Sequence, residues 1–158
     1  MISPHARIAV CLVALAHPVA AASISCPDLA TAVQVAVCPA EEELRYTFNG
    51  FCSSDAQAYK GETGVCTDYQ NYRRLKNVAL WESADGAFSA YVSCDRPPAE
   101  VRAARVSSLR IARQGKINLL ICSYGDGLKF TLRTRAECRL DAIEGCANDA
   151  AACKAACD

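Results

Sequence analysis

Cysteine and histidine are the residues of this 158-residue chain with the richest side-chain chemistry. Cysteine occurs eleven times, a share of about 7% that approaches the composition of a disulfide-rich scaffold. Histidine occurs only twice, as His5 and His17, so both imidazoles lie close to the N-terminus. The thiol, metal and imidazole chemistry of this protein therefore depends on whether its N-terminal segment is retained.

Residues 1–22 have the pattern of an export signal. A short polar start with one histidine and one arginine precedes nine apolar residues at 8–16, which are too few to cross a bilayer. Pro18 ends this apolar segment, and Ala20-Ala21-Ala22 supplies the small residues of a cleavage site. We therefore predict a signal peptide at 1–22 that is cleaved after Ala22.

Cleavage leaves a single secreted, cysteine-rich domain at residues 23–158, because a chain of this length fits one domain. Two alternatives stay open: an uncleaved apolar N-terminal helix, and a lipoprotein modified at Cys26. The second lacks the apolar residue that is expected three positions before the modified cysteine. No later segment contains 18 consecutive apolar residues, so we expect no transmembrane segment in the mature chain.

The mature chain would contain ten cysteines and no histidine. An even number of cysteines in an exported protein predicts up to five disulfides, whose connectivity cannot be read from the sequence. None of the ten forms a C-x-x-C pair, which argues against a thioredoxin-like motif or a zinc ribbon, and we predict no metal and no cofactor. The predicted disulfide residues are Cys26, Cys38, Cys52, Cys66, Cys94, Cys122, Cys138, Cys146, Cys153 and Cys157.

The loss of both histidines restricts the catalytic mechanisms that remain. Ser-His-Asp and Cys-His catalysis and histidine-rich zinc sites all need an imidazole. A hydrolase that uses paired carboxylates stays formally open, with Glu41, Glu42, Glu43 and Glu62 as candidate acids. The first three follow Pro39 directly, where acidic residues complement the dipole of a helix's first turn. We therefore interpret them as the start of a helix and predict no catalytic residue.

Charge is balanced overall but unevenly distributed along the sequence. Lys plus Arg and Asp plus Glu both number 17, so no net charge favours nucleic acid as a partner. Residues 96–139 carry ten basic side chains against three acidic ones, whereas residues 23–95 carry five against ten, and residues 140–158 carry one against four. The basic excess thus coincides with the segment in which we predict most of the strands.

Strand alternation places several of these basic residues on one solvent-exposed face of the predicted sheet. We predict this face as a binding patch for an anionic protein, an envelope polyanion or a membrane surface. The alternative is that the basic side chains only solvate the sheet, or pair with the glutamates after Pro39 and the acidic C-terminal segment. The predicted contact residues are Arg110, Lys129, Arg133 and Arg135.

The hydrophobic periodicity predicts an α+β fold, namely an antiparallel β-meander of about five strands with N- and C-terminal helices, stapled by disulfides. A turn at 83–86 with an Asp-Gly hairpin signal separates the first two strands, and Trp81 is expected in the core. The strands are expected at 78–82, 87–94, 106–113, 117–124 and 128–133.

Helices are expected on both sides of this meander. The segment from residue 28 to residue 37 is a short helix, or a strand if its valines alternate, and a helical turn is expected around 68–75. A C-terminal helix is expected over 136–157, with Cys146, Cys153 and Cys157 on one face.

Residues 77–140 resemble small uncharacterised exported domains of Gram-negative bacteria. The resemblance rests on Leu80-Trp81, Tyr91-Val92-Ser93-Cys94, Cys122-Ser123-Tyr124 and Cys138. It implies a periplasmic antiparallel-sheet domain without assigned catalysis, and it transfers no active-site residue. The cysteine-rich ends at 26–66 and 146–157 depart from that pattern.

Taken together, the sequence predicts a periplasmic or secreted, non-enzymatic binding or interaction protein that is stabilised by disulfides. Two alternatives remain: a histidine-free carboxylate hydrolase of the cell envelope, and a structural envelope component. Exposure of the single tryptophan and clustering of carboxylates in a cleft are the features that would separate these classes.

Overall fold

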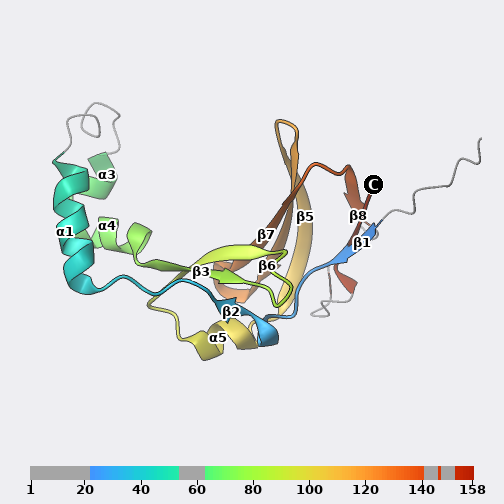
Figure 1. Cartoon of the computed structure of the whole chain (residues 1–158), viewed down its shortest axis with the longest axis horizontal. Coiled ribbons are helices and arrows are strands. Elements are labelled where there is room, and N and C mark those ends of the chain that lie inside the picture. Colours follow the sequence, from blue (N-terminus) through green and yellow to red (C-terminus); the bar gives the residue numbers. More distant parts are fainter. Residues whose placement is uncertain (1–21, 54–62, 141–145, 147–151) are drawn as a thin grey trace, which may run out of the picture.

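The computed structural model describes residues 22–53, 63–140, 146 and 152–158. It confirms the α+β class, with helices, two antiparallel sheets and disulfides (Figure 1). The strands are β1 (Ala22–Ser25), β2 (Val33–Gln34), β3 (Val78–Glu82), β4 (Ser89–Ser93), β5 (Val106–Gln114), β6 (Ile117–Tyr124), β7 (Lys129–Thr134), β8 (Cys138–Leu140) and β9 (Lys154–Cys157). The helices are η1 (Leu29–Thr31), α1 (Glu41–Cys52), α3 (Thr63–Cys66), α4 (Tyr69–Lys76), α5 (Pro98–Ala103) and η2 (Gly125–Gly127).

The larger sheet has the strand order β2-β3-β4-β7-β6-β5. All five predicted strands are present, and the turn between β3 and β4 is closed by Asp85, which accepts hydrogen bonds from the Ser83 hydroxyl and the Ala87 amide. The strand order of a simple meander is wrong, however, because β4 pairs with β7 and leaves β5 at the edge. Since β6 is apolar on both faces, it takes an inner position, and β5 with Arg110 and Arg113 is suited to a solvent-exposed edge.

The inner face of this sheet forms the main core. Trp81 is 3% exposed and packs in one cluster with Phe130 and Leu120, which are fully buried. Residues of η1 and α5, including Leu29 and Val101, close this cluster, and the Arg102 guanidinium lies 5.3 Å from the centre of the Trp81 ring. The expected core position of the tryptophan is therefore confirmed, and α5, for which no helix was predicted, helps to cover it.

The predicted C-terminal helix is wrong wherever the structure describes it. Residues of the segment form β8 and β9, which join β1 in a three-stranded sheet of order β1-β9-β8. Ala155 and Cys157 are buried while Lys154 is exposed, so burial follows the period of a strand. Pairing with β1 outweighs the helix propensity of this alanine-rich segment. The rest of the predicted helix lies outside the described residues.

The predicted helix at 28–37 is wrong beyond η1. After Thr31 the chain becomes extended, and Val33 and Gln34 pair with β3, so the alternative strand interpretation holds for β2. The valines of the 28–37 segment face solvent, with Val33 50% exposed and Val37 91% exposed. A helix would have needed a buried apolar face, whereas these residues gain backbone hydrogen bonds at the edge of an existing sheet.

The structure pairs the ten cysteines of the described residues in five disulfides: Cys26–Cys122, Cys38–Cys94, Cys52–Cys66, Cys138–Cys157 and Cys146–Cys153. Cys26 is bonded to β6 in the core, and a sulfur in a disulfide is not available for a lipid, which argues against the lipoprotein alternative. Nearby, the Tyr124 hydroxyl donates a hydrogen bond of 2.6 Å to the carbonyl of Pro27, so the N-terminal segment is fastened twice to β6.

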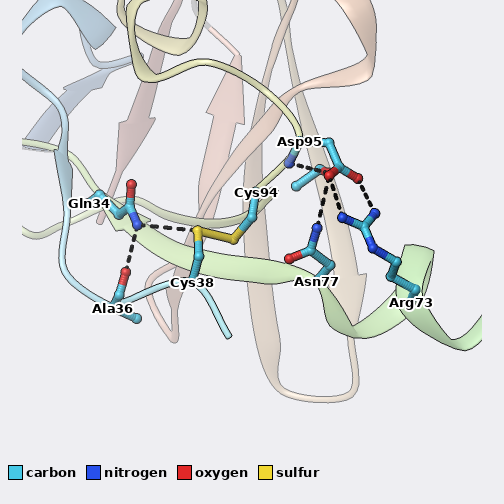
Figure 2. Close-up of a disulfide and its surroundings, with 8 residues drawn as sticks. Gln34, Ala36, Cys38, Arg73, Asn77, Cys94 and Asp95 are labelled. Carbon is cyan, nitrogen blue, oxygen red and sulfur yellow. Dashed lines mark hydrogen bonds and ion pairs between the residues drawn. A yellow bond between two sulfur atoms is a disulfide. The ribbon is translucent and has the colours of Figure 1, made fainter. Parts of the chain in front are cut away.

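The Cys38–Cys94 disulfide joins the segment before α1 to the end of β4. Figure 2 shows the Gln34 amide nitrogen between the Cys38 sulfur, at 3.6 Å, and the Ala36 carbonyl oxygen, at 2.9 Å. This disulfide anchors the start of the helical segment that contains α1, α3 and α4, which Figure 1 shows away from the strands β5–β7.

Candidate functional site

Three of the four predicted contact residues lie on the outer face of the larger sheet. Arg110 in β5 is opposite Ile121 in β6, and Ile121 is opposite Thr131 in β7, so these side chains share a face. Lys129 and Arg133 stand two positions to either side of Thr131 and share that face too. All three basic side chains are exposed. Arg135 is also exposed but follows the last residue of β7, so the strand register does not fix its direction.

A depression of about 550 Å³ lies on this outer face, and we call it the basic groove. Its apolar wall includes Leu80, Leu119 and Ile121, and Ile121 is only 8% exposed. Lys129 and Arg133 contribute the positive charges, whereas Arg110 lies on the same face outside the lining. The remaining lining residues are Ser89, Ala90, Tyr91 and Thr131.

The basic groove forms where the sheet bends. Strands β4 and β7 share a single register pair, Ser89 with Thr131, whereas β6 and β7 share six. Figure 1 shows the β3–β4 hairpin crossing the direction of β5–β7. Because β4 and β7 diverge beyond that pair, the side chains of the hairpin and of β6 face one another across a hollow instead of forming a flat surface.

The cations of the basic groove form no ion pair among the described residues, although Glu82 stands on the same face of the sheet, cross-strand from Ser89. Other arginines do pair: Arg113 lies 3.2 Å from Glu137, and Arg105 lies 3.9 Å from Asp28. In the described part of the chain no carboxylate forms an ion pair with any of the four predicted contact residues. Of the glutamates after Pro39, Glu41 pairs with Arg45 and Arg73 of the helical segment, so it does not neutralise the sheet.

The candidate carboxylates occupy structural positions where they are described. Glu41 begins α1, as predicted, and accepts hydrogen bonds from the Tyr69 hydroxyl at 2.7 Å and the Arg73 guanidinium at 3.1 Å. The Tyr69 hydrogen bond and the two arginines lower the pKa of the Glu41 carboxyl. A carboxylate held ionised in this way is unsuited to act as a general acid near neutral pH. Glu62 lies outside the described residues.

Asp95 extends this network to the sheet. Figure 2 shows Arg73 binding both oxygens of Asp95, at 2.8 and 2.9 Å, while the Asn77 amide donates to Asp95 at 3.1 Å. The Arg73 contact is the main cause that lowers the pKa of Asp95. Arg73 in α4 therefore links α1 and the end of β4. These contacts hold the elements together and do not form an acid–base pair.

Sequence reasoning missed the uncharged half of the basic groove. Tyr91 is 75% exposed, and its place between the buried Ala90 and Val92 was a signal that it faces outward. Leu119 was signalled by the apolar residues on both faces of β6, which we interpreted only as the mark of a central strand. No local pattern in the sequence indicated that Leu80 lines the basic groove, because only the bend between β4 and β7 brings this residue near β6.

A second depression, of about 840 Å³, lies beside α1 and α4. Leu44, Phe51 and Tyr72 line it, with Glu43 and Lys76 as its charged residues. Its wall ends at Ser53, next to residues 54–62, which lie outside the described chain. The basic groove, in contrast, does not border this segment, and we therefore take it as the candidate site.

Among the described residues, no helix is long and apolar enough to cross a membrane, and no three His, Cys, Asp or Glu side chains gather in a way suited to a metal ion. On the outer face of the larger sheet, the lining residues form an apolar hollow flanked by two cations. Comparison of the chain with protein families, with curated proteins and with solved structures finds no match.

Proposed function

We propose that this protein is an exported, disulfide-stabilised, non-enzymatic binding protein whose basic groove takes an anionic partner. One observation carries the proposal: Lys129 and Arg133 flank an apolar hollow without an ion-paired carboxylate among the described residues. Binding sites on proteins are mostly concave and apolar with a few placed polar groups, and the basic groove has this composition. The anionic class of partner follows from the sign of those groups.

The export part of the proposal is supported by two features. Five disulfides join the ten cysteines of the described chain, and such a density is characteristic of proteins that fold in an oxidising compartment. Residues 1–22 have the polar, apolar and small-residue order of a cleaved signal. These features support our proposal that the mature protein acts in the periplasm or the extracellular space, as the resemblance of residues 77–140 to exported sheet domains also implies.

Charge reversal tests the binding site. The double variant Lys129→Glu/Arg133→Glu should lower the affinity for immobilised poly-L-glutamate by at least about tenfold, because both nearby attractions become repulsions. A matched control is Lys154→Glu/Arg139→Glu, which makes the same two exchanges at exposed positions of β8 and β9. The control should keep most of the affinity, and both should keep the far-ultraviolet spectrum of the wild type.

Equal losses in the two double variants would show that only net charge matters and would reject the basic groove as the site. Failure of the wild-type protein to retain any acidic polymer at low salt would reject the binding function altogether. Binding that weakens with added salt is expected, because the contacts are exposed and screened over about 10 Å at 0.1 M ionic strength.

A further inference from the structure

We propose that the occupant of the basic groove is an extended acidic segment of another polypeptide, with two acidic residues four positions apart and an apolar residue midway between them. The inference rests on the proposed function and specifies its ligand. It follows from the spacing of the charges along β7, from the apolar surface between them and from the exposed aromatic residue at the border of the basic groove.

The first step is the spacing of the two cations. Lys129 and Arg133 are four residues apart on one face of β7, so their Cα atoms lie about 13 Å apart at the usual rise of a strand. In an extended peptide, residues four positions apart have the same separation and also point to the same side. Two acidic side chains at that interval therefore reach both cations at once, whereas a compact anion with a single charged group reaches only one.

The second step is the surface between the cations. Thr131 stands midway between them on β7, and its cross-strand neighbours are Ile121 on one side and Ser89 on the other. Ile121, Leu80 and Leu119 make this part of the wall apolar. The middle residue of the extended segment points to the same side as its two acidic residues, so an apolar side chain at that position covers this surface.

The polar and aromatic residues of the basic groove favour a peptide over a lipid as its ligand. The Ser89 and Thr131 hydroxyls lie among the apolar residues, where they can donate hydrogen bonds to peptide carbonyls that an acyl chain lacks. Tyr91 borders the basic groove with three quarters of its surface exposed, and tyrosine and arginine are the residue types that contribute most to protein–protein contacts. An acyl chain with one anionic head would use one cation and leave the other unpaired.

Arg110 gives the same face a wider positive field, and Arg135 adds an exposed positive charge just after the end of β7. Both are exposed and neither forms an ion pair with a described carboxylate. Because they lie outside the lining of the basic groove, they act at longer range and speed the approach of an acidic segment more than they hold it.

The test compares two labelled peptides of identical composition on the full mature, disulfide-bonded protein. One carries the core Glu-Ser-Leu-Ser-Glu and the other Ser-Glu-Leu-Glu-Ser, in which the acids are only about 7 Å apart in an extended chain. Fluorescence anisotropy should show about tenfold tighter binding of the first, because only its acids reach both cations. Replacing its leucine by serine should cost a further several-fold, since the apolar contact is lost.

Single variants of the protein complete the test. In Arg133→Ala the preference for the first peptide should fall to the several-fold contribution of its leucine, because one cation no longer distinguishes the spacings of the acids. Lys154→Ala, an exchange on β9, should keep the preference. Normal folding of each variant is checked by the emission of the buried Trp81.

The outcomes separate this inference from the proposed function. Equal binding of both peptides by the wild type, with loss in Lys129→Glu/Arg133→Glu, would overturn the spacing and leave an anion-binding groove. No binding of either peptide or of poly-L-glutamate would overturn both proposals. Tighter binding of vesicles containing anionic lipid than of the first peptide would also overturn the inference, in favour of a membrane surface.

Discussion

Leu119 and Leu120 show how strand geometry separates the wall of the basic groove from the core at the level of single residues. They are adjacent in β6 and identical in type, but they point to opposite faces of the sheet. Leu120 is fully buried in the core cluster, whereas Leu119 is half-buried in the wall of the basic groove. The same substitution at these two positions therefore separates the two roles.

We expect Leu120→Ala to lower the free energy of unfolding by about 2–5 kcal/mol, because it leaves a cavity in a packed core. Leu119→Ala should cost less than about 1 kcal/mol, since its surroundings are already open to solvent, but it should weaken binding of the acidic peptide. Urea unfolding followed by the emission of Trp81, together with anisotropy titrations, measures both effects. Similar losses of stability in the two variants would contradict the assigned faces.

Polar contacts contribute more to holding α1 and α4 in place than to the larger sheet, which is stabilised by its hydrophobic core. Phe48 packs against the rings of Tyr69 and Tyr72, with centroids 5.5 and 5.3 Å apart. Beyond this small cluster, Arg73 links the two helices to the sheet through Glu41 and Asp95. The Cys38–Cys94 disulfide keeps the segment attached when those contacts are lost.

These contacts make the helical segment sensitive to acid. The folded pKa values of Glu41 and Asp95 are lowered by their hydrogen bonds to Tyr69 and Arg73. A lowered folded pKa contributes stability that is fully present above the unfolded value, about 4, and is lost as the pH falls through the folded value. We therefore expect the protection factors of the α1 and α4 amides, which correct for the intrinsic pH dependence of exchange, to fall below about pH 4 while those of β6 stay high.

The control for this pH effect is Arg73→Gln, which removes both ion pairs at any pH. In this variant the carboxyls of Glu41 and Asp95 should titrate closer to ordinary values, as seen by carbon-13 chemical shifts. Unchanged pKa values in Arg73→Gln would show that the guanidinium is not what lowers them.

Element positions were predictable where the pattern is local. The β3–β4 hairpin and the strands β5, β6 and β7 follow from alternation and turn residues, and α4 falls where a helical turn was expected. For the segment that forms β9 the sequence predicted a helix, because cysteines seven and four positions apart fit one helical face. This prediction was wrong. The strand state of this segment comes from β1 and β8, which supply the backbone partners. Local propensity does not contain that information.

At the scale of the whole molecule, disulfides connect segments that are far apart in the sequence. Cys26–Cys122 spans a separation of 96 residues, and Cys146–Cys153 spans only 7. All four cysteines are buried, at 4% exposure or less. The difference in loop length is what distinguishes the two bonds.

We expect Cys26→Ala/Cys122→Ala to destabilise the protein by about 5 kcal/mol and Cys146→Ala/Cys153→Ala by about 2.5 kcal/mol, because the longer loop restricts the unfolded chain more. Urea unfolding of the two variants measures the difference, and non-reducing peptide mapping of the wild type checks the pairing. Equal destabilisation by the two double variants would show that loop entropy is not the main contribution.

The sequence by itself determined the features that depend on neighbouring residues. These are the positions of the five strands, the inward face with Trp81, the helix start at Glu41 and the outward alternation of Lys129 and Arg133. Each follows from the period of a strand or the dipole of a helix, which act over a few residues.

Only the tertiary structure decided which distant segments meet. The pairing of β4 with β7, the partners of the cysteines and the approach of Leu80 to Leu119 all depend on contacts between residues far apart in the sequence. Such contacts are selected by the burial of the whole core and not by any local pattern. The basic residues of the candidate site could thus be named from the sequence, whereas the hollow between them arises from the bend of the folded sheet.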